Sequence, residues 1–134
     1  MKPWLAAALM VPLALINPPS SSAQWVPNGT SVSTVPFSQV RPALVDDGAG
    51  GAIVIWDDYR SGSPDIYAQR IDASGAVQWT ADGVAICTAG ANQFNPEIIS
   101  DGAGGAIVTW YDSRSGGTDI YAQRIDASGA VQWT

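Results

Sequence analysis

One 15-residue stretch of this chain occurs twice. Residues 66–80 read IYAQRIDASGAVQWT, and the same letters return at 120–134, 54 residues later. Self-similarity at a fixed period of this kind indicates a repeat architecture, in which each repeat buries its apolar surface against its neighbour. The chain is therefore expected to fold as stacked copies of one small unit.

The repeat extends well beyond the identical stretch. When residues 42–80 are paired with 96–134, nine of the 39 positions differ. The spacing predicts a first repeat at 24–77, a second at 78–131 and the start of a third at 132–134. Tryptophans recur at equivalent places, Trp25, Trp79 and Trp133 in one set and Trp56 and Trp110 in the other. We expect each set to have the same structural role in every repeat.

Each repeat has the pattern of short strands and tight turns. The runs 42–46, 52–57, 66–71 and 76–80 are predicted strands, and another follows at 84–88. Glycines at 48–51 predict a tight reversal, because hairpin turns need positive φ. Two further turns, Asp72 with Gly75 and Asp126 with Gly129, fit a type I turn closed by a glycine bulge. No window predicts a capped amphipathic helix, so the predicted fold class is all-β.

Four short antiparallel strands in about 54 residues match one blade of a β-propeller. The run 52–57, AIVIWD, is apolar on both faces and therefore needs cover on both sides. Stacked blades provide that cover. We predict two four-stranded antiparallel blades that belong to a larger propeller. The alternatives are a β-sandwich-like pair of sheets and a linear β-solenoid.

The repeated residues carry a resemblance. The pattern DGxGGAIVxWxDxRSGxxDIYAQRIDASGxxxW, at 47–79 and 101–133, resembles repeats of exported bacterial β-propeller-like proteins. That resemblance implies blades in an exported protein and, for most such proteins, no assigned activity. The turn at Asp72 is also similar to the sialidase Asp-box and to the tryptophan-docking motif of quinoprotein dehydrogenases, but its Asp–Gly spacing differs from both. These two likenesses imply only a blade hairpin whose Trp79 docks on its neighbour.

Residues 1–23 are predicted to be a secretory signal peptide. Lys2 supplies the positive start, 5–16 the apolar core, and Ala23 ends a small-residue cleavage site. The rival interpretation, a membrane anchor, is disfavoured because the apolar run is interrupted by Pro12 and is shorter than the roughly 20 residues that span a bilayer. We expect a secreted protein in the periplasm, outside the cell or at its surface, with no membrane span.

Composition excludes several classes of function. The chain has no histidine and a formal net charge of −6, with its arginines scattered, so neither a histidine-based catalytic site nor a nucleic-acid surface is predicted. Cys87 stands alone, and its repeat partner is Ser33, so it is interpreted as a small half-buried strand residue. Glu97 is the only glutamate. We predict no catalysis in this chain.

The candidate ligand-binding residues come from the repeated Asp-x-Arg segments and their variable neighbours. They are Asp57, Tyr59, Arg60, Tyr111, Ser113 and Arg114. One interpretation is a polar row at a blade edge that binds a glycan or a peptide; the other is ion pairs that brace loops wherever the blade recurs. Positions that differ between repeats, such as 57/111, 59/113 and 43/97, fit partner recognition, because repeat proteins vary where partners are bound.

No cofactor is predicted. The glycine-rich turns after Asp47 and Asp101 resemble calcium turns, but one carboxylate is missing in the second repeat, which favours an Asp that bonds its own turn. The predicted function is an exported propeller-type module for binding or surface interaction. The alternatives are an N-terminal fragment of a larger exported adhesin or enzyme, and a sialidase-like glycan-processing propeller. Exposed blade faces predict self-association, such as a ring of several copies, or further blades.

Overall fold

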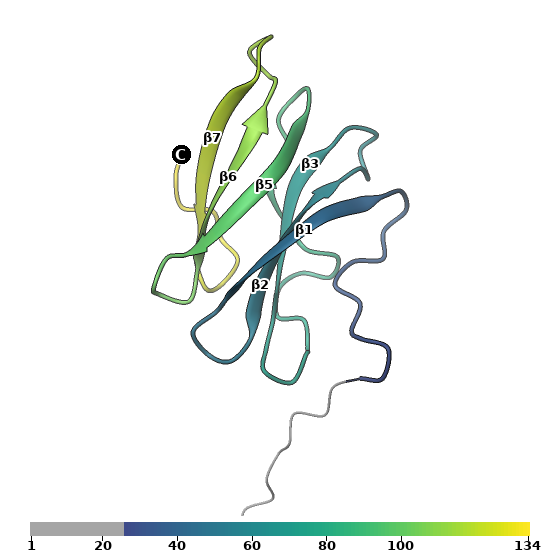
Figure 1. Cartoon of the computed structure of the whole chain (residues 1–134), viewed down its shortest axis with the longest axis vertical. Coiled ribbons are helices and arrows are strands. Elements are labelled where there is room, and N and C mark those ends of the chain that lie inside the picture. The colour runs from purple at the N-terminus through teal and green to yellow at the C-terminus, as the bar shows by residue number, and fades with distance from the viewer. Residues whose placement is uncertain (1–25) are drawn as a thin grey trace, which may run out of the picture.

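The computed structural model describes residues 26–134, so the predicted signal peptide and Trp25 lie outside the described residues (Figure 1). Residues 26–134 form seven strands and no helix, and thus no helix that could cross a membrane. The strands are β1 (Gln39–Asp46), β2 (Ala52–Asp58), β3 (Asp65–Ile71), β4 (Val84–Cys87), β5 (Gln93–Ser100), β6 (Ala106–Asp112) and β7 (Asp119–Ile125).

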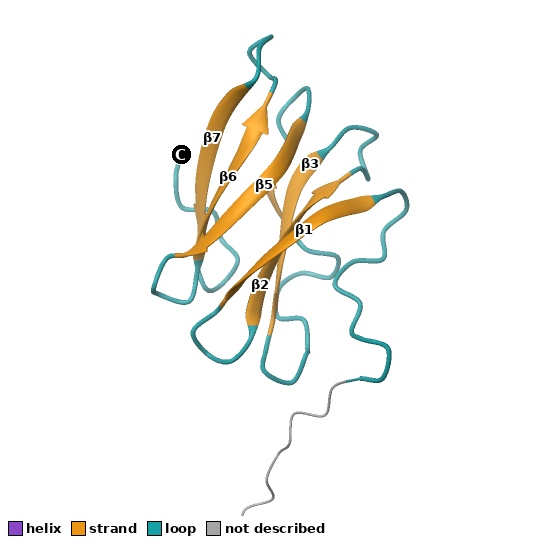
Figure 2. Ribbon diagram, in the orientation of Figure 1, coloured by secondary structure: helices purple, strands orange, loops and turns teal. Residues whose placement is uncertain are grey.

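The strands make two antiparallel sheets (Figure 2). The first has the order β1-β2-β3-β4 and the second the order β5-β6-β7. The prediction of an all-β fold is confirmed, and the pair of sheets is compatible with a β-sandwich. The second sheet has three strands and not the predicted four.

The predicted strand at 76–80 is wrong. This segment makes only an isolated bridge, between Ile71 and Val77. The buried side chain of Gln69 takes the place of a strand ladder, because its Oε1 accepts the N–H of Trp79 at 2.9 Å and its Nε2 donates to the carbonyl of Thr80 at 2.9 Å. The fourth strand is β4 instead, so the predicted repeat boundary at 77/78 falls inside the first sheet.

The two Asp–Gly turns form as predicted. The Gly75 N–H donates to the Asp72 carbonyl at 2.9 Å, and the Gly129 N–H donates to the Asp126 carbonyl at 3.0 Å. Both glycines have positive φ, 84° and 90°, which other residues rarely adopt. The Asp carboxylates accept N–H groups from inside their own turns. Each turn is therefore stabilised locally, as its sequence indicates.

The core lies between the two sheets. The face of the first sheet that lies in this core, here named its inner face, contributes Ile53, Ile55, Ile66 and Ala68. The second sheet meets it with Ala106, Val108, Trp110 and Ile125, and Ile86 of β4 joins the same cluster. These side chains alternate along their strands with residues of the opposite face, as the pleat requires. Packing between repeats, and not within one, makes the core.

Trp79 connects the two sheets. Its Nε1 donates to the carbonyl of Ala127 at 3.1 Å, and its ring covers Gly129, where an added Cβ would lie 3.0 Å from the ring atoms. Trp79, which belongs to the hairpin after β3, therefore docks on the hairpin after β7 of the neighbouring sheet. The equivalent Trp133 is 46% exposed. Glycine in the Asp–Gly turn thus serves both the turn geometry and the close approach of the tryptophan ring.

Candidate ligand-binding groove

Matching bulges interrupt β1 and β5. The pairing register shifts between Val40 and Ala43 in β1, and between Phe94 and Glu97 in β5. At the centre of each bulge Arg41 and Asn95 have positive φ, 52° and 55°, and a proline follows each. Proline has no N–H to donate, so it suits a place where the ladder is broken. Each bulge belongs to an edge strand, and the two strands lie side by side (Figure 1).

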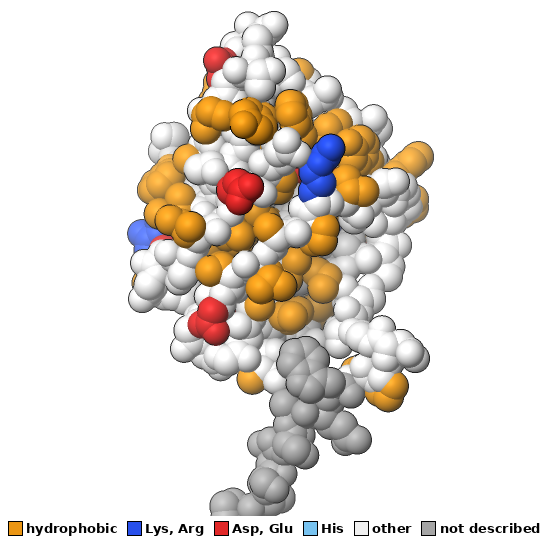
Figure 3. Space-filling view, viewed as in Figure 1, with side chains coloured by type: hydrophobic (Ala, Val, Ile, Leu, Met, Phe, Trp, Pro, Cys, Tyr) orange, Lys and Arg blue, Asp and Glu red, His pale blue; other side chains and the backbone are white. Residues whose placement is uncertain are grey.

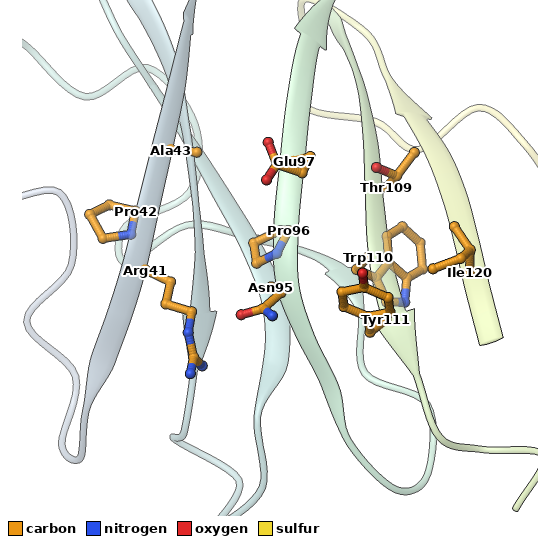
Figure 4. Close-up of a pocket in the computed structure, with 10 residues that line it drawn as sticks. All are labelled: Arg41, Pro42, Ala43, Asn95, Pro96, Glu97, Thr109, Trp110, Tyr111 and Ile120. Carbon is orange, nitrogen blue, oxygen red and sulfur yellow. The ribbon is translucent and has the colours of Figure 1, made fainter. Parts of the chain in front are cut away.

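A groove of about 490 Å³ lies beside the two bulges (Figure 3). Its lining residues come from β1, β5, β6 and β7, and Figure 4 shows them: Arg41, Pro42, Ala43, Asn95, Pro96, Glu97, Thr109, Trp110, Tyr111 and Ile120. In Figure 3 hydrophobic side chains gather over this face with a few charged ones among them.

The groove has two parts of different chemistry. The polar half lies at the bulges of β1 and β5 and presents Arg41, Asn95 and Glu97. The apolar half lies on β6 and β7 and presents Tyr111 and Ile120. The ring of Tyr111 also packs against Phe94, with 5.7 Å between ring centroids. The polar half therefore offers hydrogen bonds, and the apolar half offers surface to be buried.

The buried carboxylate of Asp57 orients the side chain of Arg41. The fully buried carboxylate accepts a hydrogen bond from Arg41 Nη1 at 2.9 Å, while 56% of the arginine side chain is exposed. The same carboxylate accepts the N–H of Asn95 at 3.0 Å, which links the two sheets. Burial raises the pKa of Asp57 above its ordinary value, although the hydrogen bonds from Arg41 and Asn95 act in the opposite direction. Asp57 therefore orients a groove residue and lies outside the groove lining.

The other predicted ligand residues are not brought together. Tyr111 lines the groove, whereas Tyr59 lines a neighbouring hollow with Phe37 and Val40, and Arg41 lines both. Ser113 donates from Oγ to the carbonyl of Asn92 at 3.1 Å. Of the variable pairs, 43/97 has both members at the groove and 57/111 has one, whereas 59/113 has none.

Arg60 and Arg114 brace the sheets. Asp58 is fully buried and accepts Trp56 Nε1 at 2.7 Å, Arg60 Nε at 2.9 Å and Arg60 Nη2 at 2.7 Å. The Arg60 guanidinium also lies 3.8 Å from the ring centroid of Tyr67. Such a charge-assisted, bidentate pair is strong and directional. These contacts support the interpretation of repeated ion pairs for Arg60.

The second repeat contains the same arrangement. Asp112 is buried and accepts Trp110 Nε1 at 3.0 Å and two hydrogen bonds from the Arg114 guanidinium, which lies 4.1 Å from the ring centroid of Tyr121. Arg114 also donates to Cys87 Sγ at 3.0 Å, so the arginine of one sheet touches β4 of the other. We name each Trp-Asp-Arg-Tyr set a brace.

The braces predict how stability depends on pH. Burial alone would raise the pKa of Asp58, but the hydrogen bonds from Arg60 and Trp56 outweigh it, and the net pKa is lowered. The pKa of Asp112 is well below its ordinary value for the same reasons. A lowered pKa contributes stability that is fully present above the unfolded value, about 3.9, and is lost as the pH falls through the folded value. Asp57 and Asp65 act in the opposite sense, because burial raises both pKa values.

We therefore expect the melting temperature to rise slightly from pH 7 into the mildly acidic range and to fall steeply below about pH 4. The rise follows because the folded state takes up protons on Asp57 and Asp65 before the unfolded state does. Fluorescence-monitored melting across a pH series measures both limbs. A melting temperature that declines steadily from pH 7 to pH 5 would contradict the assignment.

The glycine-rich turns bond to themselves. Asp47 Oδ1 accepts the N–H groups of Ala49 and Gly51, both at 2.8 Å, and Oδ2 accepts Arg70 Nε at 2.9 Å. Asp101 makes the same contacts with Ala103, Gly105 and Arg124. Both carboxylates thus have partners, as the interpretation of a self-bonded turn predicts. Among residues 26–134 no group of three or more potential metal ligands converges.

Sequence reasoning missed Arg41 and Asn95. Neither belongs to the region of strong identity, which begins at Pro42 and Pro96. The signal was present in the two X-Pro pairs 54 residues apart at the start of equivalent strands, because a proline within a strand run marks an edge or a bulge. Comparison of the chain with protein-family models, curated proteins and solved structures gives no match. The function must therefore be argued from the groove itself.

Proposed function

We propose that this protein is an exported binding module of propeller-type blades, and that it holds a neutral glycan in the polar half of the groove. The blade interpretation is supported by the sequential strand order of each sheet and by the side-by-side edge strands β1 and β5. In this arrangement β1 and β5 are the innermost strands, and the groove opens beside the axis around which blades would be arranged.

The observation that carries the proposal is the preorganised polar trio. Arg41 is held by Asp57 but remains 56% exposed, and Asn95 and Glu97 lie on the neighbouring strand (Figure 4). The trio supplies guanidinium and amide donors beside carboxylate and amide acceptors. Sugar hydroxyls donate and accept at once, so they match such a mixed set. Because the buried Asp57 already orients Arg41 in the free protein, binding loses less side-chain conformational entropy.

An extended peptide fits this place less well. β1 and β5 have free edges at the groove, which is where an added strand would bind. Pro42 and Pro96 interrupt those edges, and the bulges turn the neighbouring backbone out of register. Edges blunted in this way disfavour strand addition. The side chains of the groove therefore favour a ligand recognised through its hydroxyl groups.

A neutral ligand is favoured over an acidic one. Glu97 is exposed at the groove, and the chain carries a formal net charge of −6. A second carboxylate near Glu97 would be repelled, and Arg41 already faces the carboxylate of Asp57. Hydroxyl groups have no such repulsion and can use both residues.

The test is titration of soluble gluco-, xylo- and N-acetylglucosamine oligosaccharides by calorimetry. We expect saturable binding without turnover, weakened roughly 10- to 150-fold by Glu97→Ala, because one hydrogen bond to a charged group contributes about 1.5–3 kcal/mol. Ala43 already occupies the equivalent place in the first repeat, so the substitution suits the fold. Arg41→Lys should weaken binding similarly, since it keeps the charge beside Asp57 and removes the planar fork.

The matched control is Asp46→Ser. It removes one negative charge outside the groove lining, and the second repeat already has Ser100 there, which accepts the same turn N–H. Binding should be unchanged in this variant. Binding that survives both Glu97→Ala and Arg41→Lys would place the ligand elsewhere, and binding to none of the oligosaccharides would reject the proposal.

A further inference from the structure

The second sheet exposes a face that the first sheet buries. Ile66 is fully buried on the inner face of the first sheet, whereas the equivalent Ile120 is 66% exposed. The face of the second sheet that points away from the core, here named its outer face, also exposes Ile99 and Tyr111. Equivalent positions of the first sheet are covered by the second sheet. The residues of the outer face are thus equivalent to residues that are buried between the sheets on the first sheet, but among the described residues no sheet packs on them.

Among the described residues, the second sheet also has an unpaired strand edge, on β7. In the first sheet β4 pairs with β3, with Ile66 opposite Cys87 and Ala68 opposite Val84. In the second sheet β7 is an edge strand, and no strand among residues 26–134 pairs with its free side. An open edge beside an exposed apolar face is a template for another strand. The missing element is one with the sequence and shape of β4.

Residues 26–33 have that shape already. They are equivalent to residues 80–87, which lead into and form β4. The Gly29 N–H donates to the Val26 carbonyl at 2.9 Å, as the Gly83 N–H donates to the Thr80 carbonyl at 3.0 Å. Asn28 and Gly29 have φ of 72° and 89°, close to the 64° and 91° of Asp82 and Gly83. This segment has the conformation that precedes β4 although it pairs with no sheet.

The segment also lies in the equivalent place. Val32 lies beside Val54 and Trp56 on the side of the first sheet that points away from the core. Its counterpart Ile86 packs in the cluster that contains Trp110. Ser33 Oγ is buried and has no hydrogen-bond partner among the described residues. The segment 30–33 is therefore positioned as β4 is, and it lacks only the sheet that β4 joins.

We propose that a second copy of this chain supplies what each surface lacks. Residues 30–33 of the first copy pair with β7 of the second copy, as β4 pairs with β3 within one chain. The first sheet of the first copy then covers the outer face of the second sheet of the second copy. By equivalence with the observed register, Ser33 lies opposite Ile120 and Thr30 lies opposite Ala122. The contact repeats, between copies, the packing seen within the chain.

One difference separates the two contacts. Within the chain Asp57 accepts the N–H of Asn95, but the second repeat has Tyr111 in place of Asp57. The contact between copies therefore lacks this hydrogen bond and depends on burial of Ile120, Tyr111 and the partner's Val32. Because two different surfaces meet, the contact is heterologous and generates a closed ring or an open chain. This contact would also cover part of the groove, because Tyr111 and Ile120 line it and Ala43, the counterpart of Glu97, packs against the core within the chain. A second copy and a glycan would therefore compete for this face, and the oligomeric state is to be measured without oligosaccharide.

The test is the mass of the purified protein by light scattering over a concentration series. We expect the wild-type mass to be at least double that of one chain at high concentration, and Ile120→Asp and Ser31→Pro each to reduce it to one chain. Both residues are exposed in the single copy, so both variants should fold. Phe37→Ala is the control. Phe37 is exposed, and its counterpart Ala91 remains exposed although the two sheets pack on each other within the chain, so the same contact between copies should leave Phe37 uncovered. Wild-type protein that stays monomeric would overturn the proposal.

Mixing the variants tests which surfaces meet. Ile120→Asp leaves residues 30–33 intact, and Ser31→Pro leaves β7 intact, so equal amounts of the two should form a dimer that neither forms alone. If each copy used the same surface on both sides, mixing would restore nothing, and that result would refute the proposed pairing. Association of Ile120→Asp alone would refute it as well.

A disulfide reports the register directly. In a Cys87→Ser background, Ser33→Cys combined with Ile120→Cys should give covalent oligomers under mild oxidation, because cross-strand neighbours lie within disulfide range. Ser33→Cys combined with Ala122→Cys is the offset control and should cross-link at least several-fold less. Equal cross-linking of the two pairs would reject the register.

Discussion

Asp58→Ala should destabilise the protein by about 3 kcal/mol, which corresponds to a melting temperature roughly 10–20 °C lower. The carboxylate of Asp58 is fully buried. It accepts hydrogen bonds from the indole N–H of Trp56 and from the Nε and Nη2 groups of the Arg60 guanidinium. Its removal leaves a buried N–H unpaired and a half-buried guanidinium without its anion. The estimate lies at the low end for a broken buried pair, because Arg60 retains the Asp82 carbonyl and the Tyr67 ring.

The measurement is urea-induced unfolding at pH 7 and fixed protein concentration, since self-association would stabilise the folded state. Asp46→Ser serves as the control, because Asp46 is exposed and bonds only its own turn. The equivalent substitution Asp112→Ala should cost a similar amount. A loss below about 1 kcal/mol in both variants would show that the braces add little.

Gly51→Ala is expected to be the second large effect, with a loss of more than about 3 kcal/mol. A Cβ at Gly51 would lie 2.1 Å from the carbonyl oxygen of Ile71 and 2.8 Å from Asp47 Oδ2. The first of these is a backbone atom in the β3 strand, so the turn or the strand must move. Movement would also break the hydrogen bond from the Gly51 N–H to Asp47.

Gly48→Ala in the same turn is the matched control. Gly48 has a φ of 75° but no atom within 4 Å of the added Cβ, so only backbone strain of about 1–2 kcal/mol applies. Gly105→Ala, with its Cβ 2.2 Å from the Ile125 carbonyl, should repeat the large loss in the second sheet. Equal losses for Gly48→Ala and Gly51→Ala would mean that strain, and not the clash, dominates.

The groove shows where reasoning from the repeat alone stops. Glu97 and Tyr111 attracted attention as differences between repeats, and both line the groove. Arg60 and Arg114 attracted attention because they recur, and both are used in braces. Recurrence thus marked residues that hold the fold, whereas difference marked residues near the groove. Which differences meet could not be read from the sequence, because it depends on how one sheet packs on the next.

The sequence by itself determined the elements that depend on local chemistry. Repeated glycines and Asp side chains specify the turns, because positive φ and side-chain-to-backbone bonds act over a few residues. Apolar runs specify β2, β3, β6 and β7, and the fixed period specifies that they recur. The tertiary structure decided the rest. It placed β4, and not 76–80, beside β3, because Gln69 satisfies the intervening backbone from within the first sheet. It also brought the bulges of β1 and β5 together, since only the packing of one repeat on the next determines which edges meet.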